Sequence, residues 1–79
     1  MTDKLAEQGW MVRHTFMEAA SEPATRFFAC GLDTDREAES AIRRYPGVEN
    51  EDKVDAVRRL LAAEIAGLKI KAGDIKAWT

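Results

Sequence analysis

The chain's single histidine, His14, and its single cysteine, Cys30, have the widest range of chemistry available to them. Together they could form a Cys–His nucleophile, or they could bind a metal ion with neighbouring carboxylates. Neither lies in a spaced ligand motif such as Cys-x-x-Cys or His-x-x-x-His. Cys30 ends an apolar run that begins at Phe27, and apolar surroundings raise the pKa of a thiol and reduce its reactivity. The sequence therefore predicts a buried structural cysteine, an ordinary surface or half-buried histidine, and no catalytic, cofactor-binding or metal-binding residue.

Four acidic residues follow Cys30 at alternate positions: Asp33, Asp35, Glu37 and Glu39. Such a set could hold a hard cation or supply general acids and bases. Helix capping already explains the spacing, because Thr34 precedes Glu37 by three residues and negative charge is favourable at a helix N-terminus. The sequence contains neither an EF-hand loop nor a glycine-rich phosphate loop. We therefore interpret these acidic residues as the start of a helix.

Charge is divided unevenly along the chain. Residues 1–52 carry six basic and eleven acidic residues, a net charge of −5, whereas residues 53–79 carry six basic and three acidic residues, a net charge of +3. Basic residues beside aromatic ones are typical of nucleic-acid binding, but a total charge of −2 gives no general attraction to nucleic acid or to anionic membranes. The candidate interaction residues are Trp78, Arg43, Arg44, Arg58, Arg59, Lys69 and Lys71.

Apolar periodicity predicts the central elements. Arg26–Cys30 is short, aromatic and bounded by Pro23 and Gly31, which favours a strand. A helix over Asp35–Tyr45 follows, since its apolar residues recur at three and four residues on one face. The stretch Val54–Leu68 has two interpretations. Propensity favours one long helix, whereas the need for a strand partner favours a strand at Val54–Leu60 followed by a helix at Leu61–Leu68. We prefer the second.

The two ends of the chain are less regular. Residues 1–20 fit an amphipathic helix and an alternating strand around Trp10–Met17 equally well. Near the C-terminus, Ile75–Trp78 alternates after a turn signature at Gly73, which predicts an extended or hairpin-like unit. Burial of a Trp side chain stabilises a small domain substantially, so we expect Trp78 to fold back onto the core near Ile65 and Leu68.

These elements predict a small single α+β domain with a short sheet of two or three strands packed by two helices. The alternative is an all-α helical bundle. We expect residues 1–20 to form an N-terminal segment that is loosely attached in one interpretation, and residues 21–79 to form the domain. A chain of 79 residues buries only about 60% of its unfolded surface. A homodimer is therefore a plausible source of additional stability.

One short segment resembles a known family. Glu64–Ile75, with the sequence Glu-Ile-Ala-Gly-Leu-Lys-Ile-Lys-Ala-Gly-Asp-Ile, is similar to the helix-then-turn segment of small YjiS-like bacterial proteins. The family's usual Gly and Arg are replaced here by Lys69 and Ala72, and the remainder of the chain does not follow its pattern. We infer neither fold nor function from this resemblance.

Our expectation for function is a protein-interaction or accessory module, with an unidentified protein or a second copy as its partner. The alternative is a weak nucleic-acid-binding module that uses the basic C-terminal part. An enzyme is the least favoured class, because few candidate groups converge. The sequence shows neither an apolar leader region nor a run near the roughly 20 apolar residues of a membrane span, so the expected location is the cytoplasm.

The helix cap offers a direct test of the central element. Replacing Thr34 with alanine should lower the free energy of unfolding by about 1 kcal/mol, because an N–H of the first turn loses its acceptor. Urea denaturation measures the change, and Ser40→Ala on the solvated side of the same helix is the control. An equal loss in both variants would contradict the cap.

Overall fold

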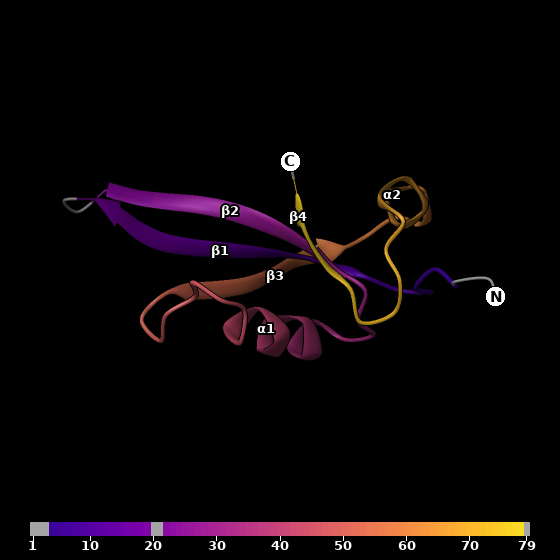
Figure 1. The fold of residues 1–79 in the computed structure, drawn as a ribbon, viewed down its shortest axis with the longest axis horizontal. Helices are drawn as coiled ribbons and strands as arrows, with labels where there is room; N and C mark the ends of the chain where they lie inside the picture. The colour runs from indigo at the N-terminus through magenta and orange to yellow at the C-terminus, as the bar shows by residue number, and fades with distance from the viewer. Residues whose placement is uncertain (1–3, 20–21, 79) are drawn as a thin grey trace.

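The computed structural model describes residues 4–19 and 22–78, and Figure 1 shows their arrangement. In chain order the elements are β1 (Trp10–Ala19), β2 (Glu22–Cys30), α1 (Asp35–Arg43), β3 (Lys53–Arg59), α2 (Ala62–Leu68) and β4 (Ile75–Trp78). The protein is therefore α+β, as the sequence predicted. Neither helix is long and apolar enough to span a membrane, as judged over the described residues.

The strands form one antiparallel sheet in the order β3-β1-β2-β4. This corrects the prediction of two or three strands, and the all-α alternative is not supported. The missing strand is β1, which lies in the ambiguous segment of residues 1–20 and is bonded on both edges, to β2 and to β3. Its aromatic and β-branched residues suit the pleated, half-buried surface that this position provides.

The strand predicted at Arg26–Cys30 is confirmed and begins earlier, at Glu22. β4 pairs only with residues 27–30 of β2, so the first half of β2 is bonded on one side alone. Pro23, which lacks an N–H donor, is tolerated there because that half of the strand needs no second ladder. The preferred division of Val54–Leu68 is also confirmed: β3 and α2 are separate elements, and β3 supplies a partner for β1.

Helix α1 begins as predicted. The Thr34 hydroxyl accepts a hydrogen bond from the backbone N–H of Glu37 at 3.1 Å and donates to the Glu37 carboxylate at 3.0 Å. The helix ends at Arg43, two residues before the predicted Tyr45, and Gly47 adopts a positive φ of 93° in the turn that follows. The connector from residue 44 to residue 52 then leads into β3.

The core has one cluster on each side of the sheet. On the side covered by α1, the cluster consists of Val12, Phe28, Cys30, Ala38, Ile42 and Val54. On the other side, it consists of Ala6, Met11, Ala29, Leu60, Ile65 and Ile70. Trp78 packs against this second cluster together with Leu68, which confirms the expectation that it folds back onto the core. Helix α2 covers only the end of this side of the sheet (Figure 1).

Gly31 is the point where the C-terminal segment passes closest to the end of β2. Its N–H donates to the carbonyl of Asp74 at 2.8 Å, and its own carbonyl accepts from the N–H of Gly73 at 2.7 Å. A Cβ at this position would overlap the carbonyl oxygen of Lys71 and lie 2.9 Å from a methyl carbon of Ile70. Only a residue without a side chain permits this approach.

We predict that Gly31→Ala lowers the free energy of unfolding by about 1–3 kcal/mol, the usual result of overpacking. Gly67 offers a matched control, because a Cβ there meets nothing within 4 Å. Gly67→Ala should leave stability unchanged or raise it by up to about 1 kcal/mol, since alanine is the better helix former. Urea denaturation of both variants tests this, and equal destabilisation by the two would contradict the close approach.

Candidate functional site

The predicted interaction residues do not gather on one surface. Arg58 and Trp78 come together, with the guanidinium carbon of Arg58 at 5.9 Å from the ring centre of Trp78. Arg59 instead lies over Trp10, at 4.9 Å, and Trp10 packs against the cluster under α1. The structure therefore divides the neighbouring arginines between the two sides of the sheet.

The other basic candidates lie elsewhere. On α1, Arg43 donates to the carbonyl of Asn50 at 3.3 Å and Arg44 to that of Ser40 at 3.4 Å. Lys69 and Lys71 follow α2 and are exposed, with Lys69 as the left-handed C-cap residue of that helix. A single basic face, which the nucleic-acid interpretation needs, is not formed by these residues.

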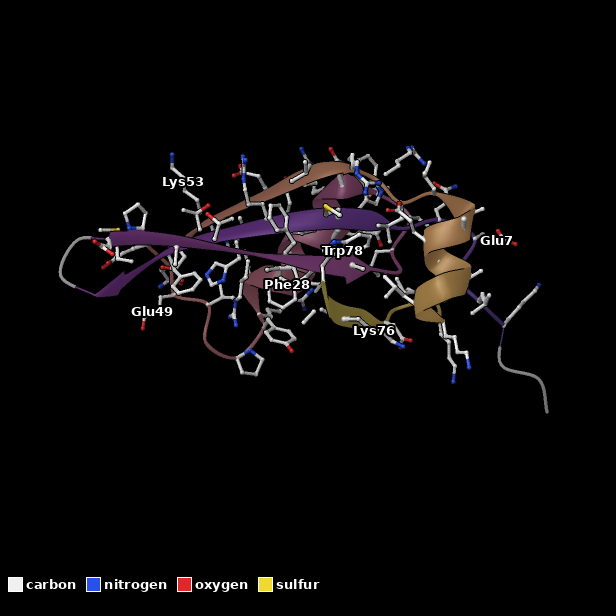
Figure 2. The ribbon with its side chains drawn as sticks, turned by 90° about the horizontal axis from the view of Figure 1, so that it is seen from above. Glu7, Phe28, Glu49, Lys53, Lys76 and Trp78 are labelled. Carbon is white, nitrogen blue, oxygen red and sulfur yellow. The ribbon has the colours of Figure 1, made fainter. Side chains whose placement is uncertain are left out.

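The side of the sheet turned away from α1 is the surface that the structure leaves open. We call it the open face, and it consists of Arg13, Thr15, Met17, Thr25, Phe27, Lys53, Asp55, Arg58 and Trp78. Figure 2 views the molecule from this side, with Lys53 towards one end and Trp78 near the middle. One row crosses all four strands, because Arg13 pairs with Asp55 on β3 and with Phe27 on β2, which itself pairs with Trp78 on β4.

The arginines of the open face are matched by carboxylates. Arg58 makes two hydrogen bonds of 2.8 Å to the carboxylate of Glu64. The bonds from Arg58, followed by the backbone N–H of Leu61, lower the pKa of Glu64 to about 2, and the pKa of Arg58 is raised. Arg13 and Asp55 form a longer, exposed pair at 3.5 Å. Guanidinium charge on this face is therefore largely balanced within the chain.

A partly buried chain of polar side chains lies on the opposite side of the sheet, towards the connector. The Nε of Arg26 donates to Nδ1 of His14 at 3.0 Å, so this ring nitrogen carries no hydrogen. Nε2 of His14 then carries the hydrogen and donates to the carboxylate of Asp52 at 2.8 Å. The same carboxylate oxygen accepts the backbone N–H of Glu49 at 2.9 Å. The chain of bonds thus ties the connector before β3 to the two central strands.

The position of His14 corrects the sequence prediction, because its side chain is 1% exposed rather than on the surface or half-buried. Its ring stacks on Phe16, with centroids 4.9 Å apart, and both of its nitrogens are engaged. A histidine whose two nitrogens are occupied has no lone pair to offer as a base or metal ligand. The alternation of Trp10, Val12, His14 and Phe16 contained the signal, since it places His14 on the same strand face as buried apolar residues.

Cys30 is fully buried, and burial raises the pKa of its thiol to about 11. It therefore lies in the interior as a neutral thiol, as its apolar surroundings predicted. Among the described residues, no group of three or more His, Cys, Asp and Glu side chains is arranged to hold a metal ion. A cleft of about 460 Å³ lies between the end of β1 and the connector, lined by Thr15, Phe16, Met17, Gly47, Glu49, Glu51, Asp52 and Lys53.

Comparisons of the chain with models of protein families, with curated proteins and with solved structures give no match. No family model therefore supports the short resemblance at Glu64–Ile75.

The hydrogen bonds from Arg26 through His14 to Asp52 predict an acid-sensitive contribution to the free energy of unfolding. Hydrogen bonds from the Glu49 N–H and from His14 lower the pKa of Asp52 from its ordinary value of 3.8. Folding therefore favours the ionised form of Asp52. The resulting increase in the free energy of unfolding is fully present above the ordinary pKa and is lost as the pH falls through the lowered pKa. Asp52→Asn should reduce the melting temperature near neutral pH, and its difference from the wild type should shrink as the pH falls below 3.8.

Thermal unfolding followed by circular dichroism across this pH range measures the effect. Glu51→Gln provides the control, because Glu51 is an exposed carboxylate of the same connector. It should follow the wild type at every pH. A difference between Asp52→Asn and the wild type that stays constant with pH would contradict the proposed role of the carboxylate charge.

Proposed function

We propose that this protein is a small interaction module that self-associates through its open face. The observation that carries the proposal is the partly exposed row of Arg13, Phe27 and Trp78 on a sheet whose other side is covered by α1. Phe27 and Trp78 are partly exposed, and Met17 on the same face is 61% exposed. Aromatic residues, Met and Arg are the types enriched where proteins meet.

The charge of this face favours a protein partner over nucleic acid. Asp55 and Glu64 are engaged with the two arginines of the face, whereas a nucleic-acid interface needs several cations free to neutralise phosphates. Arg43, Arg44 and Arg59 lie on other surfaces and do not add to it. A mixed, nearly neutral surface with aromatic residues suits a protein surface of similar composition.

The β3 edge of the sheet is less suited to association than the open face. β3 is an edge strand, and such strands tend to add further strands through their free N–H and carbonyl groups. Here the carboxylate of Glu39 on α1 accepts the N–H of Ala56 at 2.8 Å. A charged side chain bonded to this edge opposes strand addition along β3, and we take the open face as the docking surface.

The proposal predicts that the wild-type chain forms a dimer in sedimentation-equilibrium experiments. Thr25→Arg places a long charged side chain on the open face, next to the row of Arg13 and Phe27, where Thr25 is exposed and pairs with Thr15. It should weaken the dimer about tenfold or more, as expected for a charge buried without a partner (about 1.4 kcal/mol per tenfold). Circular dichroism should show an unchanged fold.

Ser40→Arg is the matched control, because it introduces the same side chain at an exposed position of α1, on the other side of the protein. It should associate like the wild type. A wild-type chain that stays monomeric, or equal association in the two variants, would contradict the proposal. Salt-dependent binding of a labelled single-stranded oligonucleotide by a monomeric chain would favour the nucleic-acid alternative instead.

A further inference from the structure

The open face differs in shape at its two ends. At one end, residues 16–19 of β1 and 22–26 of β2 extend past β3 and β4, because the last pair with β3 is at Thr15 and the first residue paired with β4 is Phe27. We call these residues the overhang; it is the long arm in Figure 1. At the other end, α2 rises on the open side of the sheet and packs through Ile65. The face is therefore a step, with the two-stranded overhang at one end and a helix at the other.

Each end of this step carries an uncovered apolar side chain. Met17 on the overhang is 61% exposed, and Leu61, the residue at the start of α2, is 65% exposed. Burial of these two side chains in an interface would favour association by about 25 cal/mol for each Å² of apolar surface removed from water. The two side chains lie at opposite ends of the molecule, so neither can cover the other within one chain.

We infer that the partner on the open face is a second copy of this chain, docked antiparallel, so that α2 of each copy lies on the overhang of the other and Leu61 meets Met17 of the partner. This inference rests on the proposed self-association and adds its register. A two-fold axis in the interface, across the long direction of the molecule, relates the copies and repeats the contact twice. With the long directions parallel, the two α2 helices would instead collide.

The area is sufficient for a stable pair. The backbone extends 47 Å by 22 Å along its two longest directions. End-for-end overlap of most of such a face buries on the order of 800 Å² per copy, which is the usual size of a specific interface. The register therefore satisfies shape, apolar contact and area together.

Cysteine cross-linking tests the register in the full chain. Met17→Cys and Leu61→Cys each replace an exposed side chain, and the native Cys30 is fully buried and does not compete for the reagent. Equal amounts of the two variants, one carrying a size tag, are mixed and treated with a short bismaleimide. We expect a covalent dimer with one copy of each variant, and at least tenfold less product from either variant alone. Ser40→Cys, on the exposed side of α1, should cross-link with neither.

Three other results would contradict the inferred register, the self-association or both. Cross-linking of Met17→Cys with itself would show a parallel register and overturn the inference. Absence of the mixed product, while sedimentation still shows a dimer that Thr25→Arg weakens, would also overturn the register but would leave self-association through the open face standing. A chain that stays monomeric in sedimentation would overturn both.

Discussion

The pairing of β1 on both of its edges is the constraint on which the rest of the structure depends. β1 joins β2 along its whole length and holds β3 on its other side, so every element after residue 30 is placed relative to it. Its alternate residues face two different environments. Val12 and His14 lie under α1 or beside the connector, whereas Met11 and Arg13 belong to the opposite side. The period of two in one strand thus decides which surface is buried and which is open.

The chain has enough helix to close one side of this sheet. α1 covers the central strands with Ala38 and Ile42, whereas α2 has seven residues and reaches only the end of the other side. Antiparallel sheets often leave one face to solvent, and the polar residues Arg13, Thr15 and Thr25 fit that pattern. Phe27, Trp78 and Met17 do not, and their partial or large exposure on this face is the reason for regarding it as a docking surface.

The sequence predicted those helices and strands that are determined by residues close together in the chain. The Thr34–Glu37 cap, the aromatic strand before Gly31 and the division of Val54–Leu68 all depend on neighbouring residues or on one missing partner. β1 could not be assigned because its residues fit both the helical period of 3.6 residues and the strand period of two. Only its pairing with two distant strands decides between helix and strand. The hydrogen bond between His14 and Asp52 joins residues 38 positions apart, and no spacing motif in the sequence predicts such a contact. The open face likewise emerges only when the four strands are placed in order.

Concentration dependence of backbone amide chemical shifts is a direct test of self-association through the open face, because it reports on the non-proline residues of the unmodified chain. Dilution series should shift the amides of the open face, above all Arg13, Thr25 and Phe27, and leave those on the outer side of α1, such as Ser40, unchanged. Shifts that concentrate on α1, or amides that do not move over the whole range, would contradict the account.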